Sequence, residues 1–153
     1  ELIQELKKRR TNPLTVIDVG CGTGILAIAI AKLFSARIIA VDNDIHAVEM
    51  TRRNIVVNKV SRYVKVYKST GLIGNHLNSG AKYDLVVANI LYNPIKSMMR
   101  SIVENLSNGG SLIFSGLNVK QTKHLKEISK QFRLKVINER KEANWGALLL
   151  KKF

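Results

Sequence analysis

The stretch from Val16 to Ala31, V-I-D-V-G-C-G-T-G-I-L-A-I-A-I-A, constrains the fold of this chain more than any other. A β-branched run is followed by three glycines spaced two apart, Gly20, Gly22 and Gly24, and then by an aliphatic run. This order predicts a strand, a tight loop and a helix, the unit from which open α/β sheets are built. Glycines let the loop backbone approach a small molecule, and the amides of the following helix point toward it. The stretch therefore predicts a small-molecule site at one edge of a sheet.

The spacing of the glycines indicates which small molecule binds there. The dinucleotide fingerprint G-x-G-x-x-G requires its third glycine where this chain has Ile25, which disfavours a nicotinamide dehydrogenase. Here the third glycine comes one position earlier, and Asp18 stands two residues before the first. D-x-G-x-G-x-G followed by an aliphatic helix resembles the first motif of the class I S-adenosylmethionine-dependent methyltransferases.

Two polar residues follow predicted strands that lie beside the glycine loop. A strand over 37–41 ends at Asp42, and a carboxylate in this position of a βαβ unit can accept hydrogen bonds from both ribose hydroxyls. A strand over 83–88 ends at Asn89, whose carboxamide is expected at the carboxyl edge of the sheet, where ligands bind. Ser69, after a strand over 64–67, is a weaker candidate for holding the adenine.

The remaining chain alternates between helical and extended patterns, which predicts a doubly wound α/β sheet of seven strands with helices on both faces. The sheet is expected to be mostly parallel, with an antiparallel last strand. Pro94 is expected to open a helix over 94–106 with Asn93 as its N-cap, and residues 105–110 are expected to form a turn. A strand over 111–115 should end at Gly116, and 71–82 should be a loop or a short helix. The other expected elements are helices over 1–10, 25–34, 45–58 and 118–132 and strands over 15–19, 133–139 and 145–151.

Composition limits the class of protein and the partners it can have. The 153 residues fit one domain, and no apolar run approaches the ~20 residues of a membrane span. The lone cysteine, Cys21, fits a reducing cytoplasm, and the histidines have no metal-ligand spacing around them. The formal charge of +14 favours a polyanionic partner such as RNA or the ribosome, although a generally basic surface explains it equally well. The candidate RNA-facing surface is a lysine stripe on the helix over 118–132, formed by Lys120, Lys123, Lys126 and Lys130.

Several segments in order extend the resemblance from the superfamily to one family. They are the V-I-D-V-G-C-G-T-G stretch, V-D-N-D, R-x-N-I-V-V-N, Y-D-L-V-V-A-N-I-L, F-S-G-L and N-W-G-A-L-L-L. Together they resemble the catalytic domain of the PrmA-type bacterial methyltransferases that modify ribosomal large-subunit protein eleven. The resemblance implies an S-adenosylmethionine-dependent enzyme that methylates lysine and α-amino groups of a ribosomal protein. A single domain over 1–153 is expected, without the N-terminal substrate-recognition domain of that family.

The predicted site combines the motif residues with the resemblance. Asn89 is expected to be catalytic, by accepting N–H bonds from the acceptor amine and aiming its lone pair. The residues expected to bind the cofactor are Asp18, Gly20, Cys21, Gly22, Gly24, Asp42, Asn43, Ser69 and Asn89. Trp145 is expected to pack at a sheet edge, with the mouth of the site as the alternative. Two other functions remain open: a methyltransferase acting on rRNA or another nucleic-acid base, and a cofactor-binding module that is inactive alone.

Overall fold

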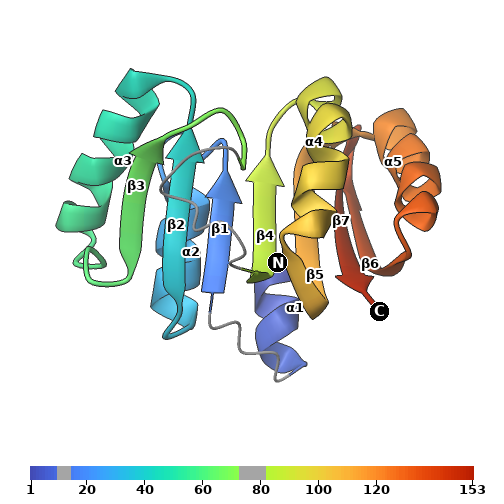
Figure 1. Cartoon of the computed structure of the whole chain (residues 1–153), viewed down its shortest axis with the longest axis horizontal. Helices are drawn as coiled ribbons and strands as arrows, with labels where there is room; N and C mark the ends of the chain where they lie inside the picture. Colours follow the sequence, from blue (N-terminus) through green and yellow to red (C-terminus); the bar gives the residue numbers. More distant parts are fainter. Residues whose placement is uncertain (10–14, 73–81) are drawn as a thin grey trace.

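A computed structural model describes residues 1–9, 15–72 and 82–153 of the chain. Its described strands form one sheet in the order β3-β2-β1-β4-β5-β7-β6 (Figure 1). The strands are β1 (Thr15–Val19), β2 (Arg37–Asp42), β3 (Val64–Lys68), β4 (Tyr83–Asn89), β5 (Leu106–Asn118), β6 (Leu134–Glu142) and β7 (Trp145–Lys152). The helices are α1 (Leu2–Lys8), α2 (Ile25–Leu33), α3 (Ile45–Val57), α4 (Tyr92–Glu104) and α5 (Val119–Gln131).

Strands β1 to β5 are parallel, and β7 runs antiparallel to both β5 and β6. Because the parallel strands point the same way, their carboxyl ends meet at one edge of the sheet (Figure 1). The strand order reverses beside β1, which is the position where open α/β sheets bind ligands. The predicted doubly wound, mostly parallel sheet with an antiparallel last strand is confirmed.

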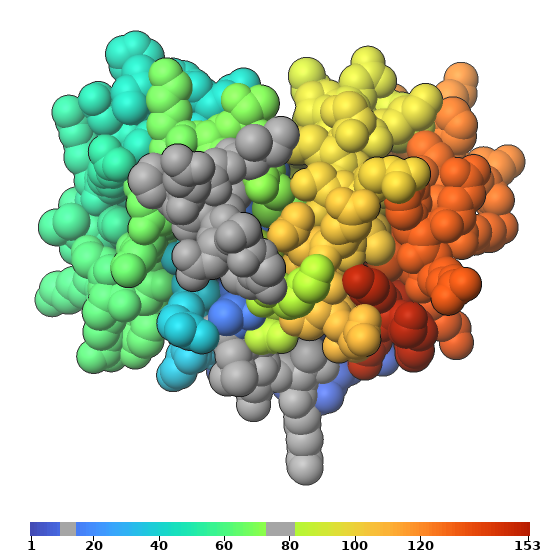
Figure 2. Space-filling view, viewed as in Figure 1, coloured from blue at the N-terminus to red at the C-terminus, as the bar shows by residue number. Residues whose placement is uncertain are grey.

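Two hydrophobic cores lie on the opposite faces of this sheet. Helices α1, α2 and α3 bury apolar side chains in one core, and α4 and α5 do so in the other. Figure 2 shows the face that carries α4 and α5. Alternation along the strands divides the side chains between the cores: Val16 belongs to the first and Ile17 to the second, both fully buried. Continuous apolar strands such as β4 are typical of a sheet covered on both faces.

The structure corrects the sequence prediction at both ends of α4. The helix begins at Tyr92 after an N-cap at Leu91, whereas Asn93 was expected to cap it and Pro94 to open it. Proline lacks an N–H, but the first turn of a helix leaves its N–H groups unbonded, so Pro94 fits inside that turn.

The predicted turn over 105–110 is also wrong, because β5 begins at Leu106, which pairs with Tyr83. An irregularity in the β4–β5 ladder and a positive φ of 74° at Gly109 accommodate this polar segment within the strand. Nor does β5 end at Gly116. That residue has φ +75°, lies at a register shift between β5 and β7, and the strand continues to Asn118.

Helix α3 buries only a narrow face. Val48 and Ile55 are buried with Thr51 between them, but Ile45 and Val56 are exposed. The segment expected to be a loop or short helix, 71–82, falls largely on residues 73–81, outside the described residues. Among the residues that the structure describes, no helix is long and apolar enough to cross a membrane.

Candidate functional site

The glycine loop is fastened to the end of the neighbouring strand β2 by backbone hydrogen bonds. The amides of Gly20 and Cys21 both donate to the carbonyl oxygen of Val41, at 2.8 and 3.0 Å. The amide of Gly22 donates to Oδ2 of Asp42 at 2.9 Å. Gly20 and Asp42 are 22 positions apart in the sequence. These hydrogen bonds join the glycine loop and the Asp42 carboxylate into one unit at the carboxyl edge.

Two glycines of this loop serve different purposes. A Cβ at Gly20 would overlap the side-chain methyl of Ile90, so glycine allows the segment after β4 to pack against the loop. A Cβ at Gly22, where φ is +56°, would meet no atom within 4 Å among the described residues. The left-handed conformation excludes most side chains there, while the space above the backbone stays open to a ligand. Gly24 is the N-cap of α2.

Asp18 lies beneath the loop and is only 1% exposed. Because the N-cap Gly24 has no side chain, the first turn of α2 takes its acceptor from β1: the amide of Ala27 donates to Oδ2 of Asp18 at 3.0 Å. The other carboxylate oxygen, Oδ1, is buried without a partner among the described residues. Burial raises the pKa of Asp18 to about 7, and the charge of Asp42 adds to this shift. The geometry gives Asp18 a role in positioning α2 and the loop, and direct contact with a cofactor stays a prediction.

Cys21 is a buried thiol in the same loop. It is 6% exposed, and its Sγ lies 3.5 Å from Oγ1 of Thr51. Burial raises the pKa of Cys21 to about 11, so the group is a neutral thiol near pH 7 and not a nucleophile. The hydroxyl of Thr51 donates to the carbonyl oxygen of Gly22 at 2.9 Å. Thr51 thus holds the loop from α3, a role that its position within an amphipathic helix pattern did not reveal.

The carboxylate of Asp42 organises the turn after β2. Its Oδ1 accepts from the amide of Asp44 at 3.0 Å, and its Oδ2 accepts from Gly22. Each carboxylate oxygen has a second lone pair, so the group can still accept hydrogen bonds from a ligand. Asp44 caps α3 by accepting from the amide of His46 at 2.9 Å. Asn43 is exposed between the two aspartates.

Ser69 lies at the end of β3, next to the same turn. Its amide donates to the carbonyl oxygen of Asp42 at 2.8 Å, and its hydroxyl donates to the carbonyl oxygen of Gly71 at 3.2 Å. The predicted residues after β1, β2 and β3 therefore lie side by side along the carboxyl edge.

Asn89 is the last residue of β4 and is exposed. Its side chain lies over Gly116 of β5: a Cβ at Gly116 would come within 2.5 Å of Oδ1 of Asn89. Gly116 was expected only to end a strand, but it makes room for the carboxamide. The overlap between Gly20 and Ile90 places Asn89 and its segment directly beside the glycine loop.

A hollow of about 600 Å³ opens at Asn89, lined also by Leu91 and Trp145. A second hollow, of about 470 Å³, shares Ser115, Gly116 and Trp145 with it and extends toward α1 and the β6–β7 turn. Trp145 is 64% exposed, so its expected packing at a sheet edge is wrong and it lines the approach to Asn89 instead.

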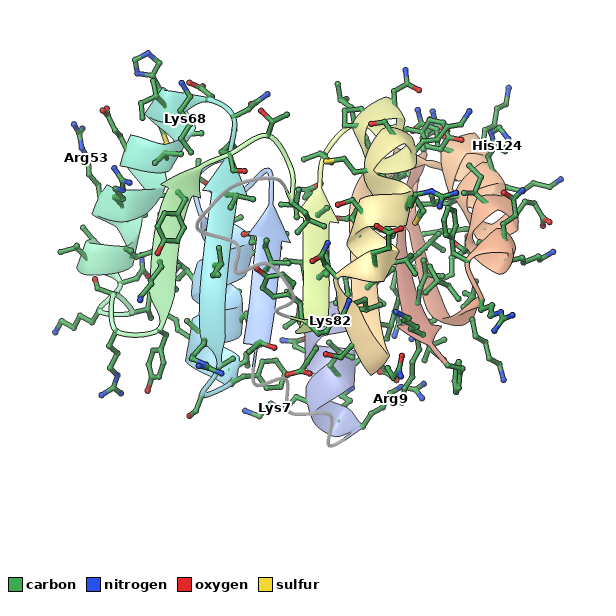
Figure 3. All side chains as sticks on the ribbon, in the orientation of Figure 1. Lys7, Arg9, Arg53, Lys68, Lys82 and His124 are labelled. Carbon is green, nitrogen blue, oxygen red and sulfur yellow. The ribbon has the colours of Figure 1, made fainter. Side chains whose placement is uncertain are left out.

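The two described histidines lie on different helices, His46 in the first turn of α3 and His124 on α5. His124 is on α5, where its Nδ1 is 3.0 Å from the hydroxyl of Tyr92, and Figure 3 shows it at the far end of the molecule from α3. Within residues 1–9, 15–72 and 82–153, no three His, Cys, Asp or Glu side chains gather where they could hold a metal ion.

The family model for ribosomal protein L11 methyltransferase (PrmA) matches the chain over residues 1–153. The chain belongs to this family. Curated relatives named ribosomal protein L11 methyltransferase include one from Bradyrhizobium diazoefficiens, 32% identical over 94% of this chain and 49% of its own length. Another, from Geotalea uraniireducens, is 34% identical over 92% of this chain and 43% of its own length. The chain thus spans about half the length of these family members.

Solved structures agree with this family assignment. A ribosomal protein L11 methylase from Lactobacillus delbrueckii subsp. bulgaricus superposes with a TM-score of 0.86 at 26% identity, covering 99% of this chain and 77% of that one. The O-methyltransferase TomG from Streptomyces achromogenes, solved with SAM, superposes with a TM-score of 0.78 at 13% identity, covering 99% and 78%. At that identity the second likeness shows the fold alone.

Proposed function

We propose that this chain is the catalytic domain of a cytoplasmic S-adenosylmethionine-dependent methyltransferase that modifies amino groups, lysine side chains or an α-amine, of a ribosomal protein. The observation that carries the proposal is the position of Asn89. Its carboxamide stands at the carboxyl edge beside the glycine loop, at the mouth of a hollow wide enough for a side chain of the acceptor. Family membership supports the choice of a ribosomal protein as substrate.

The edge of the sheet fits an adenosine-containing cofactor. Asp42 has lone pairs left for two ribose hydroxyls, and its orientation is fixed by the amides of Gly22 and Asp44. The open space above Gly22 lets a ligand approach the backbone closely. Ser69, bonded to the carbonyl of Asp42, is in place to border the base. The contacts of the other predicted residues, Gly20, Gly24, Cys21 and Asn43, are proposed on the same grounds.

The bound cofactor supplies a sulfonium-activated methyl group, so the protein has mainly to orient the acceptor and exclude water. An ammonium has no lone pair, and the acceptor must therefore reach the site as a neutral amine. Oδ1 of Asn89 can accept a hydrogen bond from that amine and direct its remaining lone pair. The hollow beyond Asn89, bordered by Leu91 and Trp145, gives the acceptor chain an apolar path to this point.

One labelling experiment tests the proposal and separates it from the alternatives. The chain is incubated with methyl-labelled S-adenosylmethionine and with either ribosomal protein or rRNA from dissociated large subunits. Label in an acid-stable protein amine, lost in Asn89→Ala, is the expected result. Label in RNA would identify a base methyltransferase instead. Cofactor binding by calorimetry without transfer to either fraction would indicate a binding module that needs a further recognition domain.

A ribosomal partner also raises the question of RNA contact through the basic surface of α5. Two of the four lysines expected to form that surface are engaged in ion pairs: Lys126 with Glu139 and Lys130 with Glu127, both at 2.8 Å. These pairs weaken the case for α5 as an RNA surface, and a different part of the molecule offers a better one.

A further inference from the structure

A third hollow, of about 420 Å³, lies over the amino-terminal ends of β1, β2 and β4 and along β3. Most of its lining lies at the opposite end of the strands from Asp42 and Asn89, and along β3 it reaches Tyr67, which pairs with Val41. Four cations line it: Arg37, Arg62, Lys65 and Lys82. Figure 3 shows Lys82 at the base of β4. The described lining contains no Asp or Glu, so the hollow concentrates positive charge in a concave surface.

Strand register gathers these cations beside aromatic rings. Arg37 and Ile39 are two apart on β2, and Lys65 and Tyr67 are two apart on β3, so each pair shares a face of the sheet. Lys65 pairs with Ile39 and Tyr67 pairs with Val41 across the two strands. Ile39 and Tyr67 lie on the face that carries α4, with Tyr67 half-buried, whereas Ile38 and Tyr63 pack toward the other face, so the hollow wraps around the amino-terminal ends of the strands.

The cations of the hollow are not neutralised by carboxylates within the described part of the chain. None of the ion pairs formed there uses any of the four. The neighbouring carboxylate, Asp84, accepts from the amide and the hydroxyl of Thr15, at 3.0 and 3.1 Å. Lys82 donates to the carbonyl oxygen of Glu104, which carries no charge.

Aromatic groups complete the hollow. The guanidinium of Arg62 lies 4.6 Å from the ring centroid of Tyr63, and Tyr67 and Tyr83 complete the aromatic lining. The hydroxyl of Tyr83 is buried without a hydrogen-bond partner among the described residues. Guanidinium and ammonium groups bind phosphates, while flat rings stack on bases, and this combination recurs in sites for single-stranded nucleic acid. The volume is sufficient for one nucleotide.

We propose that this hollow binds single-stranded RNA, with one base against the half-buried ring of Tyr67 and the adjacent phosphates on Arg37, Arg62 and Lys65. The net charge of +14 favours a polyanion over a single phosphorylated ligand. The lining is concave and aromatic. It therefore fits a nucleic-acid strand whose bases are free to stack better than it fits a flat anionic surface such as a membrane. The inference is independent of methyl transfer, because it concerns RNA binding by the chain alone, with neither cofactor nor methyl acceptor present.

The test measures binding of a fluorescein-labelled single-stranded oligoribonucleotide to the 153-residue chain by anisotropy over a range of salt concentrations. The variant R37Q/K65Q removes two cations from the hollow, and K120Q/K123Q removes two exposed cations from α5 as a matched control. We expect R37Q/K65Q to weaken binding about tenfold near 0.1 M salt and to lower the slope of log K against log salt by about 1.4, or 0.7 for each phosphate contact. The control should change neither quantity by more than about twofold.

A second pair of variants tests stacking. Tyr67→Leu should weaken binding about fivefold or more, and Tyr67→Phe, which keeps the ring, should not, since stacking uses the face of the ring. Thermal unfolding checks that each variant is folded, and only folded variants are compared. Equal losses in R37Q/K65Q and K120Q/K123Q would overturn the proposal in favour of diffuse surface charge. Competition by a mononucleotide or by heparin as effective as that by the unlabelled strand would likewise overturn it.

Discussion

The two ends of the same strands carry opposite chemistry. At the carboxyl edge, backbone amides and the carboxylates of Asp42 and Asp44 border the candidate cofactor site, and Asp18 is buried beneath the glycine loop. At the amino ends, long cationic side chains and tyrosines line a hollow without a carboxylate among its described residues. The same sheet thus carries two different sites. One is acidic and formed largely by backbone amides, and the other is basic and formed by side chains.

The difference shows how burial changes the energetic weight of a charge. The carboxylate of Asp18 is out of contact with water, and burial moves its pKa by several units, whereas the cations at the amino ends keep their charged groups near solvent. Removing a charge should therefore change folding stability strongly at the first edge and weakly at the second. Asp18 tests the first half of this contrast, and Asn89, Asp42 and Gly116 test the division of roles within the carboxyl edge.

The largest expected effect is on stability, in Asp18→Asn. Burial raises the pKa of Asp18 from 3.8 to about 7 in the folded chain, so between these values the folded state holds a proton that the unfolded state has lost. Stability contributed by this group is therefore highest at low pH and falls by about 1.4 kcal/mol for each pH unit up to about pH 7. Asparagine keeps the acceptor for Ala27 but cannot ionise. Urea unfolding should show that the free energy of unfolding of the parent falls relative to that of Asp18→Asn as the pH rises across this range. A difference that does not change with pH would contradict a raised pKa at Asp18.

Asn89→Ala should lower turnover about a hundredfold at saturating cofactor, because the acceptor amine loses the group that orients its lone pair. Cofactor affinity, measured by calorimetry, should change by less than about threefold. The acceptor in this assay is the ribosomal protein that takes up label from methyl-labelled S-adenosylmethionine. A variant with unchanged turnover would remove Asn89 from the mechanism while leaving the cofactor site intact.

Whether a residue of this site could be predicted from the sequence depends on whether its position is set by local structure or by tertiary packing. The positions of Gly20, Gly22, Asp18 and Asp42 at this edge could be predicted because a strand, a glycine loop and an acid after the next strand have a fixed spacing set by the βαβ unit. The position of Asn89 could be predicted because parallel strands end at one edge, whereas its role stays a prediction. These are local or topological constraints, and they leave a pattern along the chain.

The remaining contacts depend on tertiary packing. Thr51 is a helix residue whose hydroxyl reaches the loop carbonyl of Gly22, and Gly116 is a strand residue that makes room for Asn89. Neither has a sequence pattern of its own. The basic hollow draws on separate segments from Thr15 to Tyr83, and only the register of β1, β2 and β3 brings them together. The start of α4 was misjudged because Pro94 is equally acceptable at several positions of a first turn.

Asp42→Ala should separate binding from turnover in the opposite sense to Asn89→Ala. It removes the acceptor for the amides of Gly22 and Asp44 together with the proposed ribose contact. Cofactor affinity should fall about thirtyfold, in line with the loss of hydrogen bonds to a charged group, while turnover at saturating cofactor stays within about threefold. Asp42→Asn, which keeps one acceptor oxygen, should lie between the two. Equal effects of Asp42→Ala and Asn89→Ala on turnover would refute the division of roles between the two residues.

The smallest expected effect is that of Gly116→Ala, which tests whether the position of Asn89 matters apart from its identity. The new Cβ would come within 2.5 Å of Oδ1 of Asn89, in a residue whose φ of +75° already disfavours a side chain. The carboxamide must then move by a fraction of an ångström, and turnover should fall about tenfold while cofactor affinity stays unchanged. Gly109→Ala is the matched control, since Gly109 also has a positive φ, 74°, but no atom of the described residues lies within 4 Å of its Cβ position. If both variants lose turnover equally, backbone strain in β5 is responsible; a loss confined to Gly116→Ala ties the rate to the placement of Asn89.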